Sequence, residues 1–539
     1  MSQDQQQDVW KWATYTLWLA MTLILLLTMN DYGMSWDEIT RWNSGDLKLD
    51  YFERVAEHGM SEWGNDLRGD LYPGLFDLPL AIYAKYTGGD RLLAGHLYII
   101  FFSLLAAIAA AMVARELGGW RLAFWAVLLL MMLPRFYGHC VFNPKDIPFA
   151  ATYTWGLWGV LYTARTITEK RYSRWVVAGL LAGVAMSTRL PGMIILAYLL
   201  GITVYRFASQ SMPNDQHSWR LPPPREWIDG IGGLLIASLC AYGVLLCFFP
   251  ASHHNPFADS ARVVGALHTF SDSIPVLFRG EVYDAGSTPW YYAPWMLLMV
   301  TPLWQLALLV TGIALAFAQL ISMWRRRLWW ASEVVPFGVV LVGFGFPLLY
   351  LIASQPAIHN GVRHVLFIIP TGAVLMAYGL ARLFKLASSK GRLAPLIVTA
   401  VVVFCILSNI ASLIRLHPYQ YVYFNALSGG PSMALGQYET EYWFTSMPEG
   451  FRQLQAWREE QGLSGDEVAV MVTGPLEIAE YQLPAGWKVV QTPDSAHYFL
   501  GNTQFAGHLI VDGEEIITIE RMGLPIMVIK QLQGEVAEH

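Results

Sequence analysis

The sequence is poor in charge and in cysteine, and both shortages narrow the class of protein. Only 14% of its 539 residues are charged, whereas a soluble domain has about 25%. The four cysteines, Cys140, Cys240, Cys247 and Cys405, show no metal-ligand spacing and predict no disulfide framework. All but Cys140 lie in apolar runs, where cysteine usually acts as a small buried hydrophobic residue. The composition therefore argues against a soluble domain, a zinc module and a disulfide scaffold.

The sequence also lacks a basic arm, internal repeats and low-complexity runs. Its net charge of −6 gives no electrostatic footprint for nucleic acid. No small-x-small cleavage site follows the first apolar run, so we expect an uncleaved membrane anchor instead of a signal peptide. Repeated halves are typical of secondary transporters, and their absence counts against that class.

The sequence is instead rich in long apolar runs. Hydrophobic residues make up 55% of the chain, and 22 Trp and 26 Tyr suffice to line both interfaces of a membrane. Runs near the roughly 20 residues of a membrane-spanning helix occupy 12–30, 92–114, 120–134, 148–165, 174–188, 190–206, 228–249, 293–320, 328–352, 364–384 and 393–414. We expect an α-helical polytopic membrane protein with about eleven transmembrane helices. The pair 174–188 and 190–206 could also form one long kinked segment.

Lysine and arginine give the orientation, because they are enriched in cytoplasmic loops. With the N-terminus inside, the inner loops hold Arg115, Arg121, Arg165, Lys170, Arg171, Arg174, Arg206, Arg220, Arg225, Arg325, Arg326, Arg327, Lys385, Lys390 and Arg392. The short outer loops hold chiefly Arg135, Lys145, Arg189, Arg262, Arg279 and Arg363. Every loop agrees with this topology only if 174–188 and 190–206 are separate spans. We therefore expect a cytoplasmic N-terminus.

This topology divides the chain into a transmembrane domain, 1–414, and an outer C-terminal tail, 415–539. The outer loops are 31–91, 135–147, 250–292 and 353–363. In the tail, strand-like runs at 467–472, 487–491, 508–511 and 516–519 and a helix-like run at 449–461 predict a small extracytoplasmic α/β domain. The first outer loop is expected to be partly helical, because apolar residues recur between Asp37 and His58, with an interruption at Gly45.

Charges of both signs gather where the outer loops meet the spans. Asp37 and Glu38 follow the first span, where a carboxylate is costly unless it faces water, a partner or a substrate. The other groups are Arg135, His139, Lys145 and Asp146 in one short loop, and Arg363 and His364 at the end of another. Such sets favour an anionic ligand with an acid or base beside it. The simpler alternatives are a solvated helix start at Asp37 and cations that reach lipid headgroups.

The order of these features resembles the GT-C glycosyltransferases. The acidic pair at 37–38, Asn-Pro-Lys-Asp at 143–146 and Gly-Val-Arg-His at 361–364 are similar to the protein O-mannosyltransferase and aminoarabinose-transferase group, glycosyltransferase family 39. Two tail segments, 417–425 and 438–443, resemble the stretch that follows the last span in bacterial members. The resemblance covers most of the membrane part and the start of the tail.

The resemblance implies that a sugar moves from a polyprenyl-phosphate donor to an acceptor hydroxyl, on the periplasmic side of a bacterial inner membrane. Asp37 matches the first-loop catalytic acid, with Glu38 as its neighbour in the motif. Asp146 matches the second-loop acid, which would orient the sugar or Lys145. Arg363 matches a cation that meets the donor phosphate.

Further site residues are inferred from position alone. Lys145, His364 and Arg189 are candidate ligands of the donor phosphate, although Arg189 could equally serve the turn between two spans. The candidate substrate contacts are His139, Arg135 and Tyr72. Asp37, at the water edge, could accept the proton of the acceptor hydroxyl. Arg363 could hold the leaving phosphate through two parallel N–H contacts, and direct displacement would invert the anomeric centre.

We expect no cofactor and no metal, because no D-x-D or H-x-x-x-H spacing accompanies these acids and histidines. The expected partners are the lipid-linked donor, a glycan, lipid or protein acceptor, and the bilayer. The main alternative is a transporter or flippase of a lipid-linked sugar; a membrane scaffold would leave the charges unexplained. Glu439 and Glu441 alternate with aromatic residues, and we expect a solvated edge of the tail there in preference to an acceptor site.

Overall fold

A computed structural model describes residues 3–59, 70–167, 169, 171–211, 223–269, 273–328, 334–463 and 467–532. Within these residues, eight helices are long and apolar enough to cross a membrane. They are α1 (Gln3–Thr28), α4 (Arg91–Met131), α8 (Ile194–Ser211), α9 (Pro224–Phe248), α12 (Leu303–Arg325), α13 (Val334–Ser354), α14 (Ile369–Ser388) and α15 (Leu393–Leu416). The predicted class, a helical membrane protein with a small α/β tail, is confirmed.

Lys170 and Arg220, two of the predicted inner cations, lie outside the described residues.

Three further predicted spans are helical without forming separate long helices. The runs 92–114 and 120–134 both lie in α4, which is broken at Gly118 and Gly119, where the backbone leaves helical geometry. The runs 148–165 and 174–188 form the shorter helices α6 (Asp146–Ala164) and α7 (Tyr172–Thr188). The run 293–320 is interrupted at Pro302, between α11 (Tyr292–Val300) and α12.

Close helix contacts depend on small residues. A Cβ on Gly312 of α12 would lie 1.9 Å from the carbonyl oxygen of Leu375 in α14. A Cβ on Gly179 of α7 would lie 2.4 Å from the carbonyl oxygen of Ala237 in α9. Small residues let membrane helices approach until their backbones touch. The first of these contacts fixes α14, whose leading turn, η7 (Arg363–Ile368), begins with a candidate site residue.

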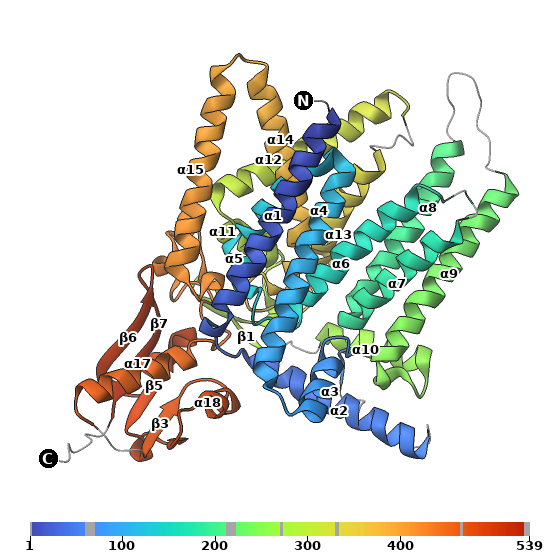
Figure 1. Cartoon of the computed structure of the whole chain (residues 1–539). Coiled ribbons are helices and arrows are strands. Elements are labelled where there is room, and N and C mark those ends of the chain that lie inside the picture. The colour runs from blue at the N-terminus through green and yellow to red at the C-terminus, as the bar shows by residue number, and fades with distance from the viewer. Residues whose placement is uncertain are drawn as a thin grey trace.

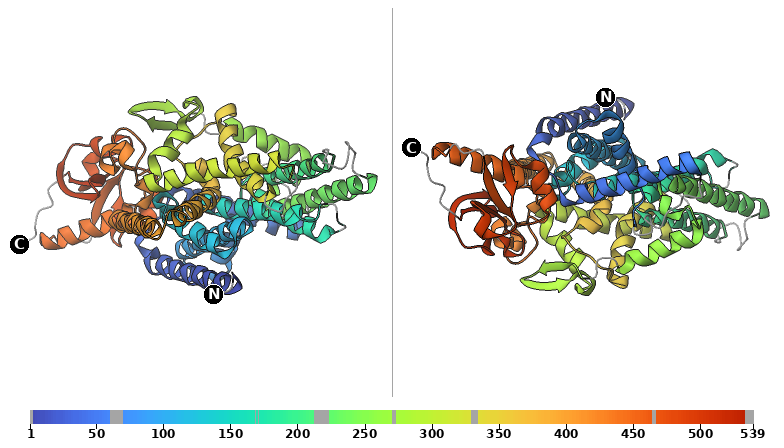
Figure 2. Two further views of the ribbon diagram at one scale, coloured as in Figure 1. Left: turned by 90° about the horizontal axis from the view of Figure 1, so that it is seen from above. Right: turned by 90° about the horizontal axis from the view of Figure 1, so that it is seen from below.

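The bundle has two distinct ends (Figure 1). The N-terminus and the α14–α15 turn lie at one end, whereas α2 (Trp36–His58), α3 (Asp77–Thr87), α10 (Pro256–Thr269) and the tail lie at the other. We call the second one the tail end. Viewed along the bundle from either direction, the tail projects to one side of the helices (Figure 2).

Helix α2 lies across the tail end and is pinned to α3 by buried charges. Arg41 pairs with Asp77 at 3.1 Å, and Lys48 pairs with Asp77 at 3.4 Å. The helix continues through Gly45, which was predicted to interrupt it. A Cβ at that position would lie 2.6 Å from the carbonyl oxygen of Asp77, so glycine here permits the close approach of α3.

The tail contains a five-stranded sheet among its described residues, in the order β4-β3-β5-β7-β6. Its strands are β3 (Val468–Val472), β4 (Trp487–Val489), β5 (Tyr498–Asn502), β6 (Glu514–Arg521) and β7 (Leu524–Gln531), with helices α16 (Pro431–Ala434), α17 (Met447–Glu460) and α18 (Leu476–Gln482). The predicted strand at 508–511 is wrong, because 504–509 forms the 3₁₀ helix η11. The sequence analysis also missed β5, β7 and the hairpin of β1 (Pro275–Phe278) and β2 (Glu281–Asp284).

Candidate active site

The N-terminus of α2 is built by a capping box. The Ser35 backbone N–H donates to Oε2 of Glu38 at 2.7 Å, and the Ser35 hydroxyl also donates to the Phe142 carbonyl at 2.8 Å. The second contact ties α2 to the loop that carries Asp146. Glu38 thus holds the helix start, and its other oxygen faces His96 at 3.4 Å. Asp37, which lies between Ser35 and Glu38 in the sequence, takes no part in the cap, so its side chain is available for contacts with other loops.

Asp146 is held by a local turn. The Asn143 side-chain oxygen accepts from the backbone N–H groups of Lys145 and Asp146, at 3.2 and 2.8 Å. The amide nitrogen of Asn143 donates to Oδ2 of Asp146 at 3.0 Å. The Asn143 side chain thus closes a turn directly before α6, a role that asparagine side chains commonly take. The Asn-Pro-Lys-Asp motif was quoted in the resemblance, but Asn143 itself was given no role.

The two acids meet three cations from separate loops. Asp37 pairs with Lys145 at 2.9 Å and with Arg363 through its other oxygen. Asp146 pairs with Arg189 and lies 3.4 Å from the Nε of Arg363. Arg363 therefore joins both acids. We call these five residues the ion cluster; they come from three of the four predicted outer loops and the turn before α8.

The two acids and Arg363 of the ion cluster are buried, Lys145 and Arg189 are partly exposed, and the cluster carries an excess of positive charge. Asp37 is 4% exposed and Asp146 and Arg363 are 1% and 2% exposed. Three cations face two carboxylates, so one positive charge is not matched within the cluster. Burial by itself would raise the pKa of Asp37, but the charges of Arg363 and Lys145 outweigh it and hold that pKa well below its usual range.

The other predicted residues surround the cluster. The Lys145 ammonium lies 5.1 Å from the Tyr72 ring centre. The Arg135 Nε–H donates to the Tyr423 carbonyl at 3.0 Å, and its guanidinium lies over Phe424.

The two predicted histidines take different positions. Burial lowers the pKa of His139 to about 3, and this neutral ring lies 3.2 Å from the Asn143 amide nitrogen. His364 packs edge-on against the His359 ring, with 4.7 Å between the ring centres. Among its described contacts, His364 has none with the carboxylates of the ion cluster.

The tail contributes residues that the sequence analysis missed. Trp443 lies under the Arg363 guanidinium, 4.5 Å from its centre. The predicted solvated edge at Glu439 and Glu441 is wrong, since both side chains are 1% exposed or less. Burial raises the pKa of Glu439 to about 8 and that of Glu441 to about 7. The aromatic residues on both sides of the acids were the available signal, because they indicate an apolar surrounding.

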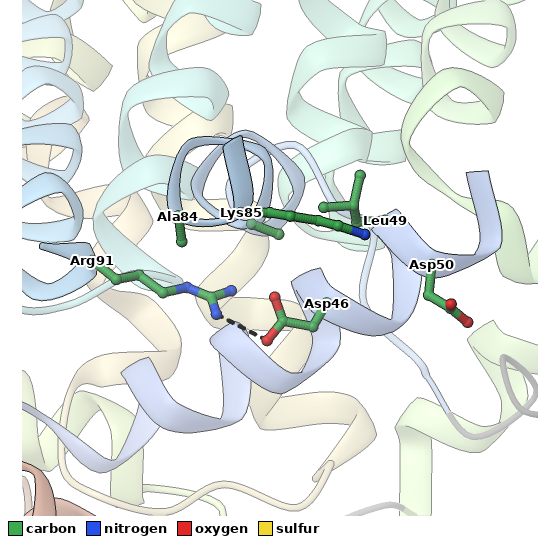
Figure 3. A pocket seen from close by; sticks show the side chains of 7 residues that line it. Asp46, Leu49, Asp50, Ala84, Lys85 and Arg91 are labelled. Atoms are coloured by element: carbon green, nitrogen blue, oxygen red, sulfur yellow. Dashed lines mark hydrogen bonds and ion pairs between the residues drawn. The ribbon is translucent and has the colours of Figure 1, made fainter. Parts of the chain in front are cut away.

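A separate cavity of about 340 Å³ lies between α2, α3 and the start of α4 (Figure 3), and no residue of the ion cluster lines it. Its charged residues are paired: Arg91 with Asp46 at 2.9 Å, Asp50 with Arg54 at 3.1 Å, and Lys85 with Glu53. We therefore take the ion cluster as the candidate site. In the described part of the chain, no three His, Cys, Asp or Glu residues are grouped so as to hold a metal ion.

This arrangement suits an anionic ligand that competes for cations already in place. An oxyanion could share Lys145, Arg189 and Arg363 with the carboxylates, and the guanidinium of Arg363 offers a planar fork to it. A carboxylate released from such pairing would become a stronger base. The geometry thus combines an anion site and a latent proton acceptor within one buried cluster.

Comparison with known proteins gives one family-model match. Residues 76–218 match the model described as dolichyl-phosphate-mannose-protein mannosyltransferase. No curated protein matches the chain.

Solved structures give distant similarities. ArnT from Cupriavidus metallidurans, bound to undecaprenyl phosphate, is 15% identical with a TM-score of 0.47, over 96% of this chain and 97% of that one. Archaeal oligosaccharyltransferase AglB from Archaeoglobus fulgidus, in complex with an inhibitory peptide and a dolichol-phosphate, is 13% identical with a TM-score of 0.47, over 90% of this chain and 65% of that one. The family-model match confirms the resemblance to the protein mannosyltransferase group that the sequence motifs predicted.

Proposed function

We propose that the protein is an integral-membrane glycosyltransferase. It moves a sugar from a polyprenyl-phosphate donor to an acceptor hydroxyl at the tail end of the bundle. The observation that carries the proposal is the ion cluster, in which three cations from different loops surround two buried acids. The match of residues 76–218 to a family whose name contains a polyprenyl-phosphate sugar donor supports it.

Arg363, Lys145 and Arg189 hold the donor phosphate in this proposal. As the bond from the sugar C1 to the phosphate oxygen breaks, the phosphate leaves with the electron pair and gains charge. Fixed cations aimed at developing charge are usually the largest single catalytic contribution. The Arg363 fork can accept two phosphate oxygens at once. His364, directly after Arg363, is a further proposed ligand of the phosphate. Arg135, His139 and Tyr72 are the proposed substrate contacts.

Asp37 is the proposed base. The acceptor oxygen bonds to C1 on the face opposite the phosphate, and its proton passes to Asp37, so that the anomeric centre is inverted. With its low pKa, free Asp37 is a weak base. A bound phosphate shares Arg363 and Lys145 and so raises the pKa of Asp37 toward the useful range. Asp146 orients Arg189 and Arg363, and Glu38 positions the start of α2.

A second cavity suits the polyprenyl chain of the donor. It has a volume of about 650 Å³ and lies between α8, α12 and α13, lined mostly by apolar residues such as Ile202, Trp324 and Phe346. Arg189 precedes α8, and Ala197, the first α8 residue of the cavity, lies roughly 12 Å further along, at about 1.5 Å per helical residue. One donor molecule could therefore place its phosphate in the ion cluster and its polyprenyl chain in the cavity along α8.

We also propose that residues 1–414 form the catalytic domain and that the tail, 415–539, is periplasmic and closes the site. The N-terminus would be cytoplasmic in an inner membrane, in accord with the positive charge of the predicted inner loops.

The test is sugar transfer from a panel of polyprenyl-phosphate sugars in detergent with EDTA. We expect transfer from at least one donor, with inversion of the anomeric centre measured by NMR. A retained anomer would contradict direct displacement. No transfer from any donor, together with movement of the lipid-linked sugar across liposomes, would support the flippase alternative instead.

A further inference from the structure

Glu439 is a buried acid without an assigned role. It lies in the tail segment that precedes α17 and is 1% exposed. None of the ion pairs among the described residues includes it. Its described hydrogen-bond donors are Tyr292, the Asn360 backbone and Gln504. A buried carboxylate that meets several donors and no direct cation is costly, so its position calls for a reason.

Glu439 anchors the turn that precedes Arg363. Asn360 and Gly361 both have positive φ, 57° and 67°, a conformation that asparagine tolerates and glycine adopts freely. The Asn360 backbone N–H donates to Oε2 of Glu439 at 2.8 Å, and the Tyr292 hydroxyl donates to the same oxygen at 3.2 Å. The Gly361 N–H donates to the Tyr292 hydroxyl at 2.9 Å. The acid thus holds both residues of the turn.

The Asn360 side chain continues this contact to Arg363. The Asn360 amide satisfies both neighbours in one orientation, which we assign from the surrounding donors and acceptors. In that orientation its nitrogen donates to Oε1 of Glu439 at 2.9 Å and its oxygen accepts from Nη1 of Arg363 at 3.3 Å. The Nη2 of Arg363 donates to Asp37, and its Nε faces Asp146. Nη1 and Nη2 then each have a hydrogen-bond acceptor, while Nε lies 3.4 Å from Asp146 without a hydrogen bond. The fork is thus held at its two terminal nitrogens.

We propose that Glu439 is a positioning residue for Arg363. As a carboxylate, Glu439 accepts from the Asn360 amide and so turns the amide oxygen toward the guanidinium. The inference rests on the proposed function, in which Arg363 holds the leaving phosphate. The tail then contributes to the reaction, because Glu439 orients the guanidinium of Arg363 through the turn at 360–361.

Protonation of Glu439 would reverse the amide. A hydroxyl on Oε1 is a donor, so Asn360 would offer its oxygen to Glu439 and its NH₂ to the Arg363 guanidinium, two donors face to face. Burial raises the pKa of Glu439 to about 8, against hydrogen bonds from Tyr292 and the turn and the charge of Arg363. The titratable or charged groups that face it are Tyr292 of α11, Arg363 of η7 and, on its own segment, Tyr442; Gln504 of η11 adds a polar contact.

The test compares kcat/KM for the donor in the parent, E439Q and E439Q/N360D at pH 9. The glutamine of E439Q keeps an oxygen for the Asn360 N–H and Tyr292, but its NH₂ reverses the Asn360 amide. We expect a loss of about tenfold, the order of one hydrogen bond to a charged group. In the double variant, the introduced glutamine donates to the introduced aspartate. The second oxygen of that aspartate accepts from Arg363, so most of the loss is regained.

The matched control is E441Q, which replaces a buried acid two residues away. Glu441 accepts from Tyr421 at 2.9 Å and from the Ser446 N–H at 3.2 Å, inside the tail. Its variant should keep the parental pH profile of transfer. At pH 6 the parent and E439Q should converge, because Glu439 is then itself protonated.

A parental kcat/KM for E439Q at pH 9, or a loss that N360D does not relieve, would overturn the role of Glu439. A parent that neither transfers sugar nor binds polyprenyl phosphate would overturn the proposed function itself. The two failures are distinguished by the parent alone.

Discussion

At the scale of single residues, Arg363 is central to the proposed site. Its guanidinium pairs with Asp37, faces Asp146 and lies over Trp443. Its importance could be read from the sequence, because a charge directly before an apolar span is costly without a purpose. Its partners could not, because Asp37 and Asp146 lie more than 200 residues away in the sequence and Trp443 lies 80 residues away.

Variants of Arg363 should show how much its charge and its planar shape each contribute to phosphate binding. We expect R363A to weaken binding of polyprenyl phosphate by about tenfold or more, because one charge-assisted contact is lost. R363K keeps the charge but not the planar fork, so its affinity should lie between R363A and the parent. Equilibrium binding in detergent measures both. The control is R392A, an exposed arginine at the opposite end of the bundle; equal affinity of R363A and R392A would contradict the phosphate role.

Glu439 and Glu441 show the limit of the sequence at this scale. Two acids that alternate with aromatic residues fit either an exposed strand edge or a buried polar pocket. The choice depends on what covers them, and Tyr292, Asn360 and Asn502 are far away in the sequence. Burial of this kind follows from tertiary contacts, and the neighbouring aromatic residues are its only local signal.

At the scale of elements, α2 is the part that positions the base. Its helical character was predicted from the residues between Asp37 and His58, and the structure gives Trp36–His58. Ser35 and Glu38 have the spacing of a capping box. A helix start at Asp37 was one of the alternatives considered from the sequence, but the role of Ser35 and Glu38 as its cap was not recognised.

Removal of the cap should disturb catalysis more than substrate binding. S35A loses the hydroxyl contacts to Glu38 and to the Phe142 carbonyl, and caps of this kind contribute about 0.5–2 kcal/mol. We expect kcat to fall by about tenfold while the KM for the donor changes little, because Asp37 shifts and the cations remain. Steady-state kinetics give both values. A change confined to KM would show that Ser35 supports the donor site instead.

Other elements were mispredicted for identifiable reasons. The run at 508–511 is apolar enough for a strand, but its first residues end the 3₁₀ helix η11, which is kinked at Phe505 and Ala506, where φ is positive. The strands β5 and β7 are buried centrally in the sheet and lack the alternation of a half-exposed strand. Proline at 302 interrupts the apolar run 293–320.

At the scale of the whole molecule, composition and charge predicted most of the organisation. The apolar runs predicted the long helices, and the structure places the N-terminus and the α14–α15 turn at one end and the tail at the other (Figure 1). Which end is cytoplasmic stays a prediction from the Lys and Arg distribution. The packing of α2 and α3 across the tail end, and the tail against Arg363, depends on contacts between distant segments and could not be read from the sequence.

The proposed orientation can be tested by labelling. Ser389, in the α14–α15 turn, and Thr492, in the tail, are both exposed. In a background without native cysteines, we expect an impermeant maleimide to label T492C in right-side-out membrane vesicles, because the tail is proposed to be outside. S389C should react only after permeabilisation. The reverse pattern, or equal labelling of both, would contradict the topology.

The most direct test of the account is D37N, assayed for sugar transfer and for binding of polyprenyl phosphate. The amide cannot accept the acceptor proton, so we expect transfer to fall by about 10²–10⁴-fold, the usual contribution of a general base. Binding of the carrier should be as tight as in the parent or tighter, since Asp37 no longer competes for Arg363 and Lys145. A folded D37N variant that transfers sugar at the parental rate would contradict the assignment of Asp37 as the base.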